Sequence, residues 1–167
     1  IGAAALEFAI LTAVRSGEVR GALWSEMNLT ERLWLIPGDR MKAGREHRIP
    51  LSVAAIAVLK RMQEYHVSDY VFPGVKQDKP LSDMSLTAAL KRMGRSDLTA
   101  HGFRSTFRDW ASETTAYPQE VCEMALAHTI ANKVEAAYRR GDLFDKRIHL
   151  MNDWANYCND LAADTDS

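Results

Sequence analysis

The chain has 167 residues; 47% are hydrophobic, 26% are charged, and the formal net charge is −1 at pH 7. This length and balance predict one soluble globular domain with a sizeable core, and the near-neutral charge by itself argues against a nucleic-acid-binding protein. A membrane-spanning protein is excluded, since no apolar run is long enough to cross a bilayer and no signal peptide is visible.

The first half of the chain predicts two helices followed by a small sheet. A strongly apolar helix is expected over 3–14, and 18–24 is expected to form a short second helix. The hydrophobic period then changes, and turn residues separate three short antiparallel strands at 27–29, 33–36 and 47–51. Lys42 falls on the connection between the second and third strands.

The remainder is expected to be helical apart from an extended segment at 70–74. Ser52, Thr99 and Pro118 mark helix starts, Asp83 or Ser82 is expected to cap a further helix, and Gly94 is expected to end it. The predicted helices span 53–65, 83–94, 101–114, 119–128, 131–138 and 143–163. The fold class is therefore α+β, mostly α-helical, with a small three-stranded antiparallel sheet. We expect a single domain over 1–167 with a disordered acidic tail from about residue 160.

The two cysteines, Cys122 and Cys158, lie far apart in helical patterns and are expected to be reduced core thiols of a cytoplasmic protein. No CxxC or HExxH spacing is present, so we expect no metal and no cofactor. The chain begins with Ile1 rather than methionine, so we expect it to be part of a longer protein.

Charge is unevenly distributed along the chain. Residues 142–167 contain six acids and two bases. Bases gather in two stretches, which are Arg40, Lys42, Arg45 and Arg48, then Lys91, Arg92, Arg95, Arg104 and Arg108. One such cluster is usually a solvated face, but two clusters beside an acidic tail favour a local basic surface of the kind that binds nucleic acid.

The motif HGFR places His101 and Arg104 three residues apart at the start of a predicted helix. At that spacing they share a face, and free N–H groups in the first turn favour an anion such as phosphate. Taken alone, HxxR more often marks a surface histidine and a salt-bridged arginine.

Arg15 stands at the exit of the apolar helix, and Glu18 follows three residues later. The arginine is either a helix C-cap or a planar fork aimed into a cleft, where the Glu18 carboxylate would hold it in place. The two interpretations are equally supported by the pair alone.

Three further residues are ambiguous when taken singly. Lys42 on a β-turn is usually solvated, and His128 at a helix end usually interacts with the helix dipole. Tyr138 lies four residues after Val134, so it is either the last apolar residue of a buried stripe or a reactive group at a helix end.

None of these residues identifies a protein family by itself, but their order along the chain is specific. With the stretches TAVRSGEVRGALWSEMNL, MKAGREHRIPLS, HGFRSTFRDWASE and LAHTIANKVEAAYRR, the sequence resembles the catalytic domain of the tyrosine recombinases from about residue 5 to about residue 158. It is most similar to the site-specific integrases of prophages and genomic islands.

The resemblance implies a set of catalytic residues, which are Arg15, Lys42, His101, Arg104, His128 and the nucleophile Tyr138, with Glu18 in support. It implies that the two arginines and His128 stabilise a pentavalent phosphorane, that His101 accepts the tyrosine proton, and that Lys42 protonates the leaving 5′-oxygen. One departure is Ala127, where many members have glycine, and its methyl group is expected to tighten the approach to the phosphate.

The resemblance also implies partners. These are double-stranded DNA attachment sites, three further copies of the chain in a homotetramer on DNA, and accessory DNA-bending or excision-factor proteins, with no membrane. We expect the family's N-terminal DNA-binding domains and the first catalytic-domain helix to be absent from this chain. The predicted helix over 143–163 either docks on a neighbouring subunit or folds back on its own domain.

Two other functions remain open at this point. A type IB topoisomerase uses the same residue set, although the hairpin and the C-terminal segment are more integrase-like. A non-catalytic DNA-binding relic is the alternative from another class, and the intact set of catalytic positions argues against it.

Overall fold

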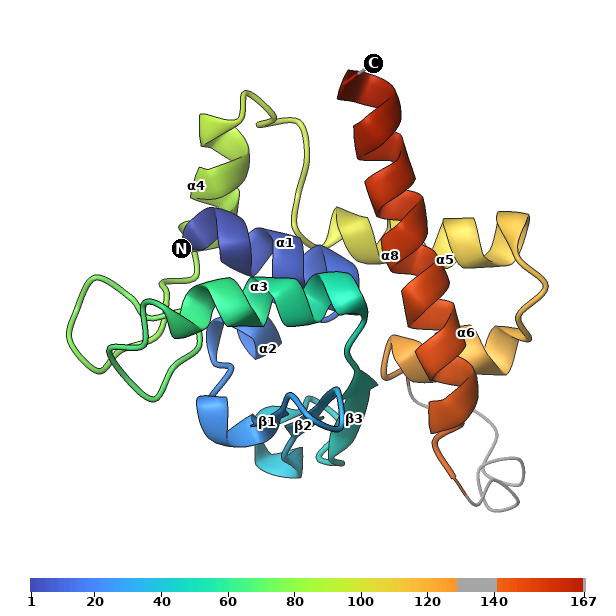
Figure 1. Ribbon diagram of the computed structural model, residues 1–167, viewed down its shortest axis with the longest axis horizontal. Helices are drawn as coiled ribbons and strands as arrows, with labels where there is room; N and C mark the ends of the chain where they lie inside the picture. The colour runs from blue at the N-terminus through green and yellow to red at the C-terminus, as the bar shows by residue number, and fades with distance from the viewer. Residues whose placement is uncertain (129–140, 167) are drawn as a thin grey trace.

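A computed structural model describes residues 1–128 and 141–166 (Figure 1). Helices dominate, and their bounds are α1 Gly2–Thr12, α2 Ser16–Arg20, α3 Val53–Gln63, α4 Ser85–Arg92, α5 Gly102–Thr114, α6 Gln119–Ala125 and α8 Phe144–Asp166. Two 3₁₀ turns, η1 Trp24–Glu26 and η2 Gly38–Arg40, flank the short strands. No helix in the described part of the chain is long and apolar enough to cross a membrane. The predicted helix over 131–138 lies outside the described residues.

The sheet has three antiparallel strands in the order β1–β2–β3, with bounds β1 Met27–Asn28, β2 Leu33–Ile36 and β3 His47–Pro50. All three strands are present and antiparallel, as predicted, with β1 and β3 each ending one residue earlier than expected. Trp34 of β2 lies opposite Ile49 of β3, and the alternating burial of β2 sends Trp34 and Ile36 into the core. Figure 1 shows the sheet at one end of the molecule, below α1 and α3.

Helix α1 forms the centre of the larger hydrophobic cluster. Its composition is apolar almost throughout, and Ala5, Leu6, Phe8, Ala9 and Leu11 are buried, as the sequence predicted. Phe8 contacts Trp34 at 5.3 Å between ring centroids, which joins the helix to the sheet. Helices α3 and α4 pack against α1. Ser52 caps α3 by accepting the Ala55 N–H at 3.2 Å, which confirms the predicted helix start.

Helices α5, α6 and α8 enclose a second hydrophobic cluster, which contains Phe107, Val121, Leu150 and Trp154. The indole N–H of Trp154 donates to the carbonyl oxygen of Ile10 at 2.8 Å and so links this cluster to α1. Helix α8 contacts α1, α3, α6 and β3 of its own chain. Of the two alternatives for this helix, folding back on its own domain is therefore the one that the structure shows.

Several predicted helix boundaries are wrong. The second helix, predicted over 18–24, is α2 over Ser16–Arg20, because Arg15 is its N-cap and Trp24 already belongs to the turn η1. Helix α4 has Met84 at its N-cap and no side-chain cap, because the chain turns there with the Ser85 N–H donating to the Ser82 carbonyl at 3.1 Å. Helix α6 ends at Ala125 rather than near His128, because the backbone becomes left-handed at Ala127. Helix α8 continues to Asp166, because no proline or glycine follows residue 141, so the expected tail has a helical backbone up to that point.

Candidate active site

An open cleft of ≈ 540 Å³ lies where the two hydrophobic clusters meet. Its walls come from three parts of the chain that are far apart in sequence: the turn between α1 and α2, the β2–β3 connection and the end of α6. The lining residues are Arg15, Met41, Lys42, Ala43, Glu123, Ala127 and His128. The fold therefore brings Arg15, Lys42 and His128, which were singled out from separate motifs, to one concave surface.

Arg15 is held at the N-cap of α2, in extended backbone geometry. The carboxylate of Glu18 accepts the Arg15 backbone N–H at 2.9 Å and the Arg15 guanidinium at 3.3 Å. The Glu18 side chain is only 7% exposed, so its two acceptor oxygens are committed to this arginine, whose own side chain is 30% exposed. Of the two alternatives for Arg15, the fork facing a cleft is the one observed; the C-cap of α1 is Ala13.

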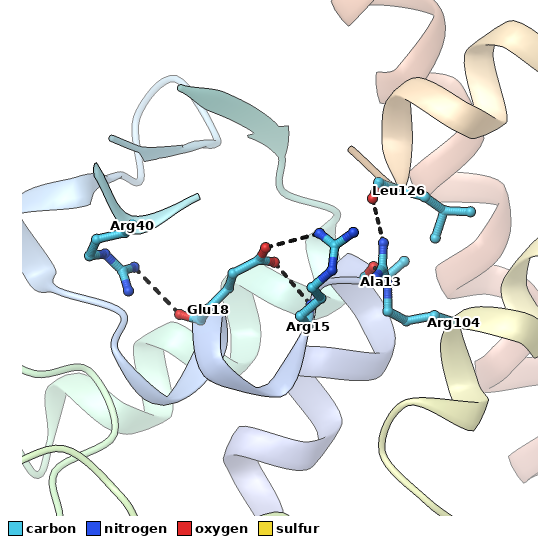
Figure 2. A network of polar contacts seen from close by, with 6 residues as sticks. All are labelled: Ala13, Arg15, Glu18, Arg40, Arg104 and Leu126. Carbon is cyan, nitrogen blue, oxygen red and sulfur yellow. Dashed lines mark hydrogen bonds and ion pairs between the residues drawn. The ribbon is translucent and has the colours of Figure 1, made fainter. Parts of the chain in front are cut away.

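Arg104 is buried, and Figure 2 shows its side chain beside that of Arg15. Its Nε donates to the carbonyl oxygen of Ala13 at 3.0 Å, and its Nη2 donates to the carbonyl oxygen of Leu126. These two carbonyls belong to the ends of α1 and α6. Arg104 therefore fixes the two sides of the cleft relative to one another and keeps its remaining N–H groups for another acceptor.

The two arginines are close enough to act on each other electrostatically. Burial and, to a smaller extent, the positive charge of Arg15 lower the pKa of Arg104 to about 10, with the Glu18 carboxylate opposing both effects. Arg104 still carries its charge at neutral pH. Around the cleft, Arg15, Lys42 and Arg104 outnumber the carboxylates of Glu18 and Glu123, and this excess of positive charge favours a bound anion.

His128 lies in the cleft wall beyond the end of α6. Its backbone N–H donates to the Glu123 carbonyl at 2.9 Å, and the Ala127 N–H donates to the Met124 carbonyl at 3.1 Å, which is the Schellman pattern. The Nδ1 atom of His128 also pairs with the Glu123 carboxylate. Glu123 thereby orients the imidazole ring. The other ring nitrogen, Nε2, takes no part in this ion pair.

The Schellman motif places Ala127 in the left-handed region, with φ 57°. An alanine costs about 1 kcal/mol there because its Cβ crowds the backbone, whereas glycine does not. Ala127 is also one of the cleft-lining residues. The expectation that its methyl group tightens the approach to a phosphate stays a prediction. The structure shows in addition that the Ala127 backbone is strained by its left-handed conformation.

Replacing Ala127 with glycine is expected to raise the free energy of unfolding by about 0.5–1 kcal/mol, because relief of the left-handed strain outweighs the added flexibility of the unfolded chain. Urea unfolding measures the change. The matched control is Ala57→Gly, at an exposed position inside α3, which is expected to lower stability by about 1 kcal/mol. Equal destabilisation by both substitutions would contradict the prediction.

Of the other predicted site residues, His101 and Arg104 are not among those that line the cleft, whereas Lys42 is. His101 is exposed at the N-terminal boundary of α5, whose first turn is capped by Thr99, the Oγ1 of which accepts the Gly102 N–H at 3.0 Å. His101 and Arg104 therefore occupy one turn but differ sharply in exposure. Lys42 is exposed on the β2–β3 connection, where the sequence predicted it. Tyr138 lies outside the described residues.

Sequence reasoning missed three groups around this cleft. Glu123 forms the ion pair with His128, Glu26 pairs with Arg40 beneath the β2–β3 connection, and His47 is buried on β3. The alternating pattern of β3 predicts that His47 faces inward, which was the one available signal. The two ion pairs carry no such signal, because their partners are brought together by the fold or by a helix end.

His47 is buried in its neutral form. Burial, together with the charges of Arg147 and Arg104, lowers the pKa of His47 to about 3, and the Ala125 backbone and Asp142 oppose this shift. Asp142 is held by Arg48, whose Nε and Nη2 donate to its two carboxylate oxygens at 2.7 Å each. In the described part of the chain, no partner lies within hydrogen-bonding distance of the His47 Nε2 atom.

Acid is expected to destabilise the domain through His47. His47 has a pKa near 6.5 in the unfolded chain and about 3 in the folded domain, so between these pH values only the unfolded chain binds the proton. The free energy of unfolding is therefore highest above pH 6.5 and falls as the pH is lowered from 6.5 to about 3. The expected loss is roughly 2 kcal/mol between pH 7 and pH 5. Urea unfolding at the two pH values measures it. His47→Gln cannot titrate and should remove most of this dependence, and an unchanged pH slope in the variant would disprove the assignment.

The described residues contain no group of three or more histidine, cysteine, aspartate or glutamate side chains that could hold a metal ion. Cys122 and Cys158 are free thiols, the first buried and the second half-buried, and burial raises the pKa of both. Neither cysteine is among the residues that line the cleft.

Comparison with known proteins gives one consistent result. The family described as "Phage integrase family" matches residues 2–143. The prophage integrase IntA of Escherichia coli K12 is 37% identical over 161 residues, which cover 95% of this chain and 38% of that protein. The integrase of Enterobacteria phage P4 is 32% identical over 171 residues, covering 92% of this chain and 39% of that protein. The chain thus spans less than half the length of these relatives.

A solved structure shares the fold. The crystal structure of a lambda integrase dimer bound to a COC′ core site matches with a TM-score of 0.54 and 20% sequence identity, over 83% of this chain and 51% of that one. The predicted fold class, mostly helical with a small three-stranded antiparallel sheet, is confirmed by this match and by the strands described above.

Proposed function

The chain belongs to the phage integrase family, the tyrosine recombinases, and from this premise we propose that it is the catalytic domain of an enzyme for site-specific DNA recombination. The reaction would integrate or excise a prophage or genomic island at double-stranded attachment sites. Its agent would be a homotetramer on DNA in the bacterial cytoplasm, assisted by DNA-bending or excision-factor proteins.

The observation that carries this proposal is the placement of two arginines at one cleft. Arg15 lines the cleft and its guanidinium is held by the Glu18 carboxylate. Arg104 lies beside it and is held by two backbone carbonyls. Planar guanidinium forks bind the non-bridging oxygens of a phosphodiester, and their charge is most valuable when a pentavalent phosphorane forms. A scissile phosphate in this cleft would lie within the range of both charges.

The proposed reaction is a transesterification at phosphorus. The Tyr138 hydroxyl oxygen attacks, a bond forms between that oxygen and phosphorus, and the bond from phosphorus to the 5′-oxygen breaks. The proton of the tyrosine passes to His101, and the leaving 5′-oxygen takes a proton from Lys42. The product is a 3′-phosphotyrosine and a free 5′-hydroxyl. Attack by the 5′-hydroxyl of a second strand reverses the step and joins the new partners.

His128 supports the same step from the cleft wall. Its Nδ1–H donates to the Glu123 carboxylate, so Nε2 can donate to a non-bridging oxygen when the ring is in its doubly protonated imidazolium form. Lys42 lines the same cleft from the β2–β3 connection. The nucleophile must come from elsewhere, because none of the seven residues described as lining the cleft has a hydroxyl or thiol side chain.

The proposal is tested with a nicked suicide DNA substrate, from which cleavage releases a short strand that cannot be rejoined. The full-length protein is expected to accumulate a covalent adduct at the 3′-phosphate. A type IB topoisomerase would instead relax supercoiled DNA without a specific site. Salt-sensitive DNA binding without any adduct would indicate the non-catalytic relic and disprove the proposal.

A further inference from the structure

The β2–β3 connection that carries Lys42 needs an anchor if it is to hold a proton donor in place. Residues 42–46 are exposed, and a lysine has a long flexible side chain with many rotamers. General acid catalysis requires the ammonium group to lie within hydrogen-bonding distance of the leaving oxygen. The contacts that fix this connection therefore bear on the reaction even when they do not touch DNA.

Arg40, two residues before Lys42, is fixed by the buried carboxylate of Glu26. Arg40 Nε donates to Glu26 Oε2 at 2.8 Å, and Arg40 Nη2 donates to Glu26 Oε1 at 2.7 Å. The indole N–H of Trp34 and the backbone N–H of Leu23 also donate to Oε1, at 3.1 and 3.2 Å. The Glu26 side chain is only 6% exposed, and these four donors compensate its burial.

The same guanidinium reaches helix α2. Arg40 Nη2 donates to the backbone carbonyl of Glu18 at 3.4 Å, as Figure 2 shows. A Cβ atom at Gly21 would lie 2.4 Å from Arg40 Nη1, so the bare backbone of this glycine leaves the space that the guanidinium occupies. Because the Glu18 carboxylate holds Arg15, the anchor of Lys42 and the anchor of Arg15 share one helix.

We propose that the Glu26–Arg40 pair is a positioning device for Lys42, which sets the height of the β2–β3 connection over the scissile phosphate relative to Arg15. Arg40 is not among the residues that line the cleft, so it acts through Lys42 rather than on DNA. This inference rests on the proposed function, in which Lys42 protonates the leaving 5′-oxygen.

The test compares two suicide substrates with the full-length protein, one with the natural 5′-oxygen and one with sulfur at the bridging position. A thiolate leaves without an acid, so any defect in proton donation disappears on the sulfur substrate. Arg40→Lys keeps the charge but loses the bidentate fork, and is expected to slow cleavage of the oxygen substrate about 10-fold or more. On the sulfur substrate it should cleave within about twofold of the wild-type rate, since the phosphate contacts are intact.

Two further variants keep the test decisive. Glu26→Gln is nearly isosteric and retains an acceptor for Trp34 and Leu23. It is expected to show the same selective defect on the oxygen substrate, and it replaces Arg40→Lys in the test if that variant does not fold. Arg61→Lys is the matched control, because Arg61 of α3 forms an exposed ion pair with Glu7 of α1 at 2.7 Å. This variant is expected to cleave both the oxygen and the sulfur substrate at the wild-type rate.

Lys42→Ala distinguishes a failure of the positioning role of the Glu26–Arg40 pair from a failure of the proposed role of Lys42. If sulfur rescues Lys42→Ala but neither Arg40→Lys nor Glu26→Gln, the pair has a general structural role and this inference is overturned alone. Unimpaired cleavage of the oxygen substrate by both variants overturns it equally. If sulfur does not rescue Lys42→Ala, the proposed role of Lys42 fails, and the inference fails with it.

Discussion

Replacing Tyr138 with phenylalanine is expected to abolish the covalent protein–DNA adduct completely, because the substitution removes one oxygen atom and leaves the ring. That oxygen is the atom that would bond to phosphorus, and no other group can take its place in a phosphotyrosine. Tyr138 lies ten residues after His128, which lines the cleft, and four residues before Asp142, which β3 holds through Arg48. Adduct formation on a nicked suicide substrate measures the effect.

The other tyrosines supply controls for this experiment. Tyr65 is 61% exposed after α3, and Tyr65→Phe is expected to leave adduct formation unchanged. Tyr117 is a poor nucleophile, since burial and the hydrogen bond from its hydroxyl to Asp153 raise its pKa to about 12. A Tyr138→Phe protein that still forms the adduct would disprove both the nucleophile and the family's chemistry for this chain.

Replacing Arg104 with lysine is expected to reduce cleavage about 100-fold or more and also to destabilise the domain. A lysine cannot donate simultaneously to the Ala13 and Leu126 carbonyls and still present a planar edge to a phosphate. Loss of one preorganised donor to a developing oxyanion typically costs about 100- to 1,000-fold in rate. Two buried carbonyls without their donor should lower the free energy of unfolding by about 2–4 kcal/mol.

Arg15→Lys is the comparison that separates these two effects. The Arg15 side chain is 30% exposed, and its structural contact is a single carboxylate, so its loss should cost about 1 kcal/mol of stability. Cleavage should nevertheless fall as steeply as in Arg104→Lys. Urea unfolding and single-turnover cleavage are measured on the same preparations. Wild-type cleavage by Arg104→Lys would show that Arg104 serves only to join α1 to α6.

Much of the fold could be predicted from local pattern. The alternation around Trp34 and the turn residues on either side gave β2 at its observed bounds, and Ser52 marked the start of α3. These features depend on near neighbours in the sequence, since a strand repeats every two residues and a cap acts over three. The boundaries that failed, at the start of α4 and the end of α6, depend on how the chain turns just outside the helix.

By itself the sequence determined the family, through the order of Arg15, Lys42, HGFR, His128 and Tyr138, and it placed Lys42 on the β2–β3 connection and HGFR at the start of α5. The tertiary structure alone decided their surroundings. It placed Arg104 under two carbonyls from distant helix ends, set Arg40 against Glu26, and buried His47 among Arg104, Arg147 and Asp142. The reason is physical: periodicity is a property of adjacent residues, whereas burial and charge pairing depend on segments that meet only after folding.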